Sequence, residues 1–143
     1  MLGGLIRAGY PIGPWAPQFM MPSPVSAFAV GTVHERPVLA VGVADRVSSW
    51  DQRAGAPVHP PIDYEPRDGR VTALALGAPA GRPVLAVGLH TGTVDLVDAQ
   101  TGRRLRRLLA YSRAEPGPEV SIGRLRFAAV AGRARLFCVS RSD

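Results

Sequence analysis

Residues 81–102 read Gly-Arg-Pro-Val-Leu-Ala-Val-Gly-Leu-His-Thr-Gly-Thr-Val-Asp-Leu-Val-Asp-Ala-Gln-Thr-Gly, and this stretch decides the fold. A continuous apolar run precedes a turn at residues 90–92, an alternating run covers residues 93–97, and a second turn closes the stretch. This order predicts two strands joined by a tight turn. Residues 36–42, Arg-Pro-Val-Leu-Ala-Val-Gly, repeat residues 82–88 without a mismatch. The chain is therefore expected to be an array of repeats.

The repeat extends well beyond this shared segment. Sliding the sequence by 46 residues aligns residues 7–42 with residues 53–88, and 16 of these 36 positions are identical. In a weaker third copy, Ile122, Leu125 and Phe127 stand where residues 71, 74 and 76 stand in the second. The expected organisation is an N-terminal segment with the outer strand of a preceding blade (1–24), a first repeat (25–70), a second repeat (71–120) and a partial third repeat (121–143).

Each full repeat contains four strand candidates. They are residues 25–30, 37–42, 47–51 and 56–62 in the first repeat, and 71–76, 82–88, 93–97 and 103–109 in the second. The second strand of each is apolar at every central position, which indicates cover on both faces of a sheet. A four-stranded antiparallel sheet covered on both faces by its neighbours is a propeller blade. The sequence thus predicts an all-β chain that forms an incomplete β-propeller, with residues 10–15 as a lone outer strand.

Residues 25–30 (Val-Ser-Ala-Phe-Ala-Val), residues 36–42 and residues 45–51 (Asp-Arg-Val-Ser-Ser-Trp-Asp) together resemble a WD40 repeat. Trp50-Asp51 stands for the dipeptide that names the family, and Val97-Asp98 is a degenerate version of it. The Gly-His pair expected before the first strand of a repeat is missing. The resemblance implies that structural signature positions of the repeat are occupied by Gly42, Asp45, Trp50, Asp51, Gly88 and Asp98. Residues 92–102 also look like repeats of quinoprotein-type propellers, which are enzymes with a cofactor site.

Positive charge is concentrated at the C-terminal end. The net charge is +6 and all 17 basic side chains are arginine; residues 103–143 carry ten of them against three acids, whereas the first 102 residues have a net charge of −1. The sharpest cluster is Arg103, Arg104, Arg106 and Arg107, on the expected outermost strand of the second blade. A charged, solvated edge prevents a strand from pairing with other chains, which is one interpretation. Binding of phosphate or of an acidic partner is the other.

Few other residues suggest chemistry. The histidines fall in or near turns and are expected at the surface, Cys138 is expected in the core, and Asp45, Asp51 and Asp98 are expected to accept backbone hydrogen bonds in turns. Residues 63–70 are expected to form an acidic, mobile connection. We find no catalytic constellation, no metal-ligand spacing and no cofactor loop, so the sequence predicts a protein that is not an enzyme and needs no cofactor.

These observations lead to a functional expectation. A non-catalytic WD40-like propeller segment would serve as a protein–protein interaction scaffold, with a protein partner, self-association or further blades completing it. The alternative is nucleic-acid or polyanion binding through the arginine-rich C-terminal part, with nucleic acid the less favoured partner. Five prolines interrupt the longest uncharged run, residues 8–34, so no membrane span is expected. A single cysteine and the lack of a secretory signal favour the cytoplasm.

Overall fold

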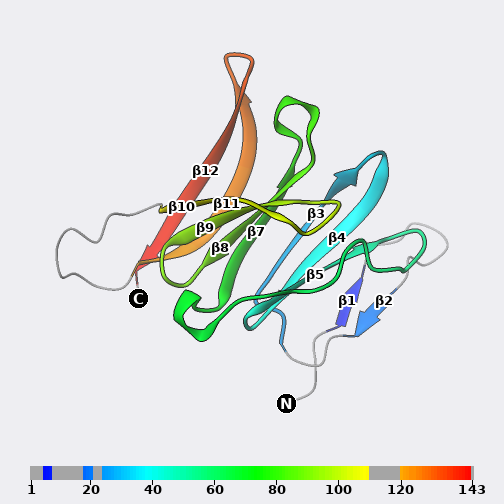
Figure 1. Ribbon diagram of the computed structural model, residues 1–143, viewed down its shortest axis with the longest axis horizontal. Helices are drawn as coiled ribbons and strands as arrows, with labels where there is room; N and C mark the ends of the chain where they lie inside the picture. The colour runs from blue at the N-terminus through cyan, green and yellow to red at the C-terminus, as the bar shows by residue number, and fades with distance from the viewer. Residues whose placement is uncertain (1–4, 8–17, 21–23, 110–119, 143) are drawn as a thin grey trace.

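The computed structural model describes residues 5–7, 18–20, 24–109 and 120–142, and over these ranges the protein is all-β with no α-helix. Figure 1 shows the arrangement of its strands. They are β1 (Leu5–Arg7), β2 (Gln18–Met20), β3 (Ala27–Val33), β4 (Arg36–Val43), β5 (Arg46–Asp51), β6 (Ile62–Asp63), β7 (Val71–Gly77), β8 (Val84–Leu89), β9 (Thr93–Asp98), β10 (Arg104–Leu109), β11 (Val120–Val130) and β12 (Arg133–Ser142). Two single-turn 3₁₀ helices, η1 (Pro66–Asp68) and η2 (Pro79–Gly81), lie in the connections.

The strands form two four-stranded sheets and two hairpins, and every pairing is antiparallel. Sheet order follows chain order in β3-β4-β5-β6 and in β7-β8-β9-β10, whereas β11 pairs with β12 and β1 with β2. The predicted four-stranded antiparallel units are confirmed for both full repeats. The described strands do not close into a ring of blades.

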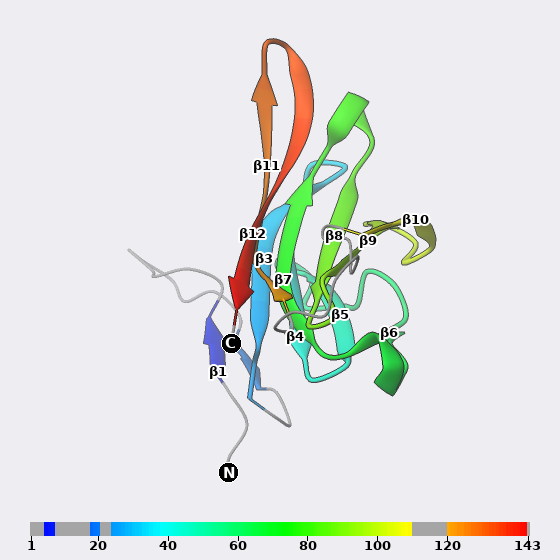
Figure 2. The same ribbon diagram turned by 90° about the vertical axis from the view of Figure 1, so that its left-hand side faces the viewer.

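The sheets stack through their first strands. Strand β7 contacts β3 on one side and β11 on the other, and these three strands run side by side in both views (Figures 1 and 2). The second sheet is therefore sandwiched between the first sheet and the β11–β12 hairpin. Its central strand β8 is buried along its whole length, as expected for a strand covered on both faces.

Large and small residues alternate along β7. Because successive residues of a strand point to opposite faces, one face of β7 carries large side chains and the other carries small ones. Leu74 and Leu76 pack toward the first sheet, in a cluster with Val38, Val47 and Val97. Ala73 and Ala75 pack toward the hairpin, in a cluster with Ile122, Leu125 and Phe127. Each sheet thus presents large side chains to the preceding unit and small ones to the following unit.

Glycines on the small face allow the next unit to come very close. A Cβ atom placed on Gly42 would lie 2.6 Å from Cγ1 of Val71, and one on Gly88 would lie 2.6 Å from Cγ2 of Ile122. A Cβ on Gly77 would lie 2.5 Å from Cγ of Phe127. Val71 and Ile122 thus occupy equivalent positions one repeat apart, in agreement with the alignment of the third copy.

One strand differs clearly from its prediction. Residues 56–62 were expected to pair with the third strand of the first repeat, but β6 comprises only Ile62–Asp63, preceded by an isolated bridge between Trp50 and Pro57. Pro57, Pro60 and Pro61 have no amide hydrogen and cannot donate to a ladder. The expected strand over residues 10–15 lies outside the described residues.

We expect Gly42→Ala to destabilise the protein. Alanine in a strand interior is ordinarily favoured over glycine by about 0.5–1 kcal/mol. Here the new methyl group would overlap Val71, and overpacking costs about 1–3 kcal/mol, so the net change is a loss. Urea unfolding measures it.

The double variant Gly42→Ala/Val71→Ala is the internal control, because it removes the atom that would clash. Its loss should be smaller than the sum of the two single losses by about 1 kcal/mol. Additive losses, or a more stable Gly42→Ala protein, would show that the close approach is not restrictive.

Candidate functional site

Arg104, Arg106 and Arg107 lie on β10, the edge strand of the second sheet, as predicted, and Arg103 directly precedes that strand. A register shift between Arg104 and Arg106 interrupts the alternation of side chains along this strand. Arg104 and Arg107 consequently both reach Asp95 on the neighbouring strand β9. The cluster is therefore divided into two arginines that contact Asp95 and two that do not.

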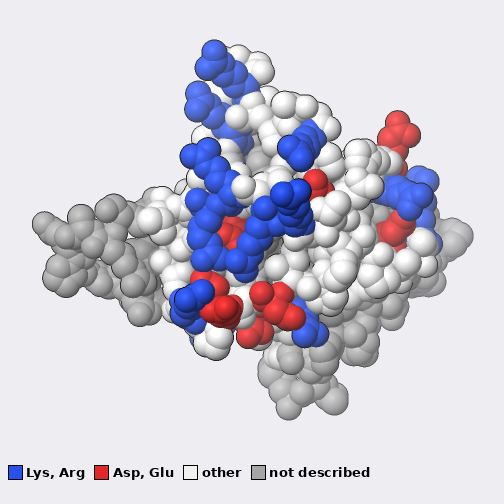
Figure 3. All heavy atoms as spheres, in the orientation of Figure 1, with Lys and Arg blue, Asp and Glu red and all other residues white. Residues whose placement is uncertain are grey.

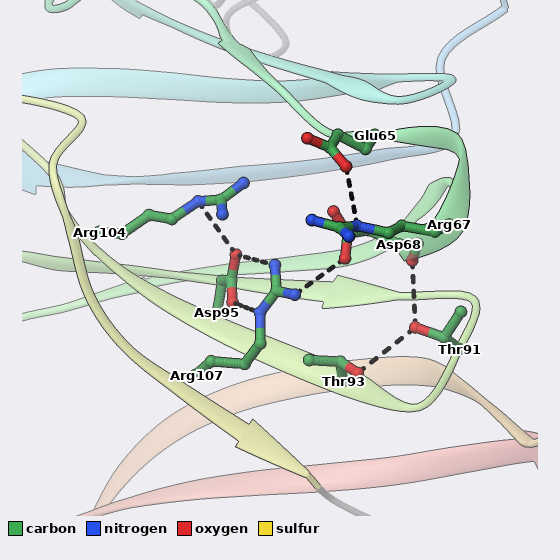
Figure 4. Close-up of polar contacts among 8 residues, drawn as sticks. All are labelled: Glu65, Arg67, Asp68, Thr91, Thr93, Asp95, Arg104 and Arg107. Carbon is green, nitrogen blue, oxygen red and sulfur yellow. Dashed lines mark hydrogen bonds and ion pairs between the residues drawn. The ribbon is translucent and has the colours of Figure 1, made fainter.

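A buried carboxylate holds two of these arginines (Figure 4). The side chain of Asp95 is 1% exposed. Nε and Nη2 of Arg107 donate to its two oxygens at 2.6 and 3.0 Å, and Nε of Arg104 lies 3.5 Å from Oδ2. Nη1 of Arg107 also donates to Oδ1 of Asp68 at 2.8 Å. Two carboxylates and two guanidiniums thus balance each other, in what we call the Asp95 cluster (Asp68, Asp95, Arg104, Arg107).

The Asp95 cluster fastens the connection between the two sheets. Asp68 belongs to η1 and is held by Arg107, while Thr91 donates to the Asp68 carbonyl at 3.1 Å. Tyr64 lies buried in the same connection, with the guanidinium of Arg104 5.0 Å from the centre of its ring. The acidic segment, residues 63–70, was expected to be mobile. It is instead held against β10 by Arg104 and Arg107, and Thr91, in the turn before β9, binds its backbone.

Burial, followed by the charge of Asp95, raises the pKa of the Tyr64 hydroxyl above its usual range. That hydroxyl is buried close to Asp95 without a hydrogen bond of good geometry. Desolvation would raise the pKa of Asp68, but the hydrogen bond and charge of Arg107 outweigh it and the pKa is lowered. The cluster thus brings two carboxylates and two guanidiniums into mutual contact beside a buried phenol, which suits it to holding two sheets together.

Arg103 and Arg106 project differently from the other two arginines. Both are exposed, and their side chains form no ion pair within the described part of the chain. By register Arg106 lies opposite Leu96, on the face that carries Leu108. Of the four arginines predicted to bind an anion or a partner, these two retain guanidiniums that face solvent.

The repeat-signature positions have structural roles. Gly42 and Gly88 lie at the close approaches between units, and their carbonyls accept hydrogen bonds from Ser26 and Thr72, at 3.1 and 3.3 Å. Trp50 packs beside Leu39 and Val41. Asp45 is exposed in the turn between β4 and β5. These residues are spread along the sheets and are not gathered at one point.

Asp51 and Asp98 accept backbone hydrogen bonds in equivalent turns. Asp51 accepts from the amides of Arg53 and Ala54 at 2.9 and 3.1 Å, and Asp98 from those of residues 100 and 101 at 2.9 and 3.0 Å. The amides of Ala54 and Arg53 lower the pKa of Asp51. Desolvation would raise the pKa of Asp98, but the amides of Thr101 and Gln100 outweigh it and the pKa is lowered.

His59 is not the surface residue that its position in or near a turn predicted. It is 5% exposed, its Nδ1 lies 2.8 Å from the Pro60 carbonyl, and its Nε2 lies 3.0 Å from Oγ of Ser49. A carbonyl only accepts, so in the neutral imidazole Nδ1 donates and Nε2 accepts from the serine. This pair has the spacing of a base and a nucleophile, but both side chains are buried, and His59 lies beneath the turn at Gly102. Its position suits it to packing and not to contact with a substrate.

A pocket of about 480 Å³ opens between the first two sheets. Among its lining residues, His34 and Gln100 meet at 2.8 Å, and Arg36 lies 3.7 Å from Asp51. The carboxylate of Asp51 is already engaged by its own turn. No group of three or more potential metal ligands occurs among the described residues, and no helix in the described part of the chain could cross a membrane.

The outer faces of the stack carry exposed apolar side chains. On β3, Phe28 is 64% exposed and Val30 is 59% exposed, on the face turned away from the second sheet. On β12, Phe137 and Val139 are 50% and 57% exposed. Both ends of the array are therefore candidate surfaces for a macromolecular partner.

We expect Asp95→Asn to destabilise the protein by about 2 kcal/mol in urea unfolding. Removing one partner of a fully buried pair costs about 3–5 kcal/mol, and the partial exposure of Arg104 and Arg107 reduces that figure because solvent screens the charges left behind. Asp63→Asn removes a carboxylate from an exposed pair with Arg46 and serves as the control. Equal losses in the two variants would contradict a structural role for the Asp95 cluster.

Acid should destabilise the protein below about pH 4, the usual pKa of an aspartate in an unfolded chain. The folded state lowers the pKa of Asp51, Asp68 and Asp98. The stability that they contribute is present above that pH and is lost as the pH falls through the folded-state values. In the Asp51→Asn/Asp98→Asn variant, whose amide oxygens still accept the turn hydrogen bonds, thermal unfolding between pH 6 and pH 2 should depend less steeply on pH. An unchanged dependence would refute the assignment.

No protein-family model matches the chain, and no curated protein matches its sequence. A functional proposal therefore starts from the stacking of the sheets and from the side chains at the two ends of the stack.

Proposed function

We propose that the chain is a WD40-like β-propeller segment that serves as a non-catalytic protein–protein interaction scaffold. The observation that carries this proposal is the exposed apolar face of β3 at one end of the stack. The successive stacking of antiparallel sheets through their first strands is compatible with propeller blades. A rigid stack of this kind presents loops and end faces to a partner without any chemistry of its own.

The exposed face is equivalent to faces that are covered elsewhere in the same chain. Phe28 and Val30 occupy the repeat positions of Leu74 and Leu76, and those leucines pack against the first sheet. In the third unit Phe127 packs against the second sheet in the same way. Burying a side chain such as phenylalanine contributes about 1.5–3 kcal/mol, so cover for Phe28 and Val30 would be strongly favourable.

The covered faces within the chain also indicate what kind of surface would pack against β3. Each covered face in this chain meets an inner strand of the form Ala-x-Ala-x-Gly, as in residues 27–31 and 73–77. The glycine leaves room for the larger residue of the neighbouring sheet, as Gly31 does for Leu76. We therefore propose that the partner is a protein that presents a blade with small side chains on the side that faces Phe28.

The groups that catalysis would use support the non-catalytic assignment. Asp95 and Asp68 are neutralised by arginines, Asp51 and Asp98 are engaged by turn amides, and His59 is buried. The alternative, polyanion binding through Arg103, Arg104, Arg106 and Arg107, is weakened on β10 because two of these guanidiniums are taken up by carboxylates of the same chain.

Insertion of one 46-residue period tests whether the face of β3 accepts a blade. A second copy of residues 25–70 is placed between Pro24 and Val25, so that its residues Ala27, Ala29 and Gly31 precede the original sheet. We expect slower hydrogen exchange in original strands β3 and β4 and a higher unfolding midpoint, because Phe28 and Val30 become buried.

The matched control carries Ala27→Arg and Ala29→Arg in the inserted copy only. It has the same length and connectivity, but its small face is replaced by long charged side chains. It should leave the exchange of original β3 unprotected. Equal protection in both insertions, or protection in neither, would refute the proposed docking surface.

A further inference from the structure

All charged residues of the β11–β12 hairpin are basic. Residues 120–142 contain five arginines and no aspartate or glutamate. Figure 3 shows basic side chains in a stripe that runs from the tip of this hairpin toward β10. In Figure 2 the tip extends beyond the two four-stranded sheets. The hairpin therefore offers a projecting positive surface without internal neutralisation by its own residues.

Two of these arginines replace the small residues on which stacking depends. In the repeat, Arg124 and Arg126 stand where Ala73 and Ala75 stand in the second sheet. The leucine and phenylalanine between and after them, Leu125 and Phe127, still pack inward. The inward face of the hairpin thus keeps the blade pattern, whereas its outward face does not suit the cover of a following sheet of the same kind.

The arginines on the outward face lie in a line along the hairpin. Antiparallel register places Arg124 opposite Val139 and Arg126 opposite Phe137. Nearer the tip, Arg135 lies opposite Ala128 and Arg133 opposite Val130. Alternate residues of a strand are about 6.7 Å apart, so these four rows extend over roughly 20 Å. The charges form a line along the hairpin, beside an exposed aromatic ring.

We propose that the outward face of the β11–β12 hairpin, comprising Arg124, Arg126, Arg133, Arg135 and Phe137, binds single-stranded nucleic acid. A line of guanidiniums suits an extended polyanion better than a compact phosphate, since arginine pairs with phosphate oxygens through its planar fork. An exposed aromatic ring next to such a line is where an unpaired base can stack. The two features together select an extended strand with unpaired bases.

The chemistry differs from that of the β10 arginines. Arg104 and Arg107 neutralise Asp95 and Asp68, and no carboxylate of the described residues forms an ion pair with the four hairpin arginines. An anionic membrane is the competing partner for a basic face with exposed apolar groups. A bilayer would require insertion of the tip, whose exposed positions include Arg133 and Arg135, so nucleic acid is favoured.

Fluorescence anisotropy with a labelled 20-nucleotide oligothymidylate tests the proposal on the full chain. We expect log K to fall with log salt concentration with a slope of about −3, from about −0.7 for each of four phosphates. Arg124→Gln/Arg126→Gln should weaken binding at least tenfold and reduce the slope by about 1.4. Phe137→Ala should weaken binding about fivefold or more and leave the slope unchanged.

The control is Arg103→Gln/Arg106→Gln, which removes the same net charge from β10 and the residue that precedes it. It should change binding less than twofold. Equal weakening by the two arginine pairs would show that only net charge matters and would overturn the proposal. So would the absence of oligonucleotide binding, or Phe137-dependent binding to phosphatidylserine vesicles without oligonucleotide binding. The insertion described above alters the opposite end of the stack, so its outcome does not bear on this one.

Discussion

The close approach between glycines of one sheet and the inner strand of the next is the constraint on which the rest of the structure depends. Gly42 faces Val71, and Gly88 faces Ile122 one repeat later, each with no room for a Cβ atom. Removing a side chain at these points lets the neighbouring β-branched residue sit against the backbone, where it makes dispersion contacts that a larger spacing would forfeit. The repeat thus preserves the glycine and the β-branched residue that faces it, in addition to the pattern of strands.

This constraint gives each sheet two different faces. Small residues on one side of β7 receive the hairpin, and large residues on the other side fill the space beside the first sheet. Such an interface is heterologous, because one kind of face meets another, and a heterologous interface continues until it closes or is terminated. The apolar face of β3 is therefore a continuation point, whereas the outward face of β11, with Arg124 in place of alanine, is a terminus for that kind of packing.

Much of the fold could be predicted from sequence because local pattern and packing agree. The apolar runs at residues 36–42 and 82–88 became the buried second strands β4 and β8, and their identity fixed the repeat. The outer strand of the first repeat could not be predicted from alternation alone, since its prolines remove the donors that pairing needs. Whether these sheets belong to a WD40 propeller stays a prediction.

The candidate sites were less accessible to sequence reasoning. Asp95 lies in an alternating run that is typical of a half-exposed strand, and its burial depends on Arg107 across the sheet and on the loop that carries Tyr64. Only the register shift in β10 places Arg104 and Arg107 together. His59 gave a weak signal, a histidine within a proline-rich segment, and its burial follows from the turn at Gly102, about forty residues away in the chain.

The distribution of charge acquires a physical meaning from these contacts. The sequence divides into a nearly neutral first part and a basic last part. Arg104 and Arg107 form ion pairs with acids of the first part, Asp95 and Asp68. Their charges therefore join β10 to β9 and to the connection that precedes β7. The hairpin that follows contains no acid, and its inner face is filled by apolar contacts with the second sheet. Arg124, Arg126, Arg133 and Arg135 thus lie on the face that stacking leaves open, where no carboxylate of the described residues forms an ion pair with them.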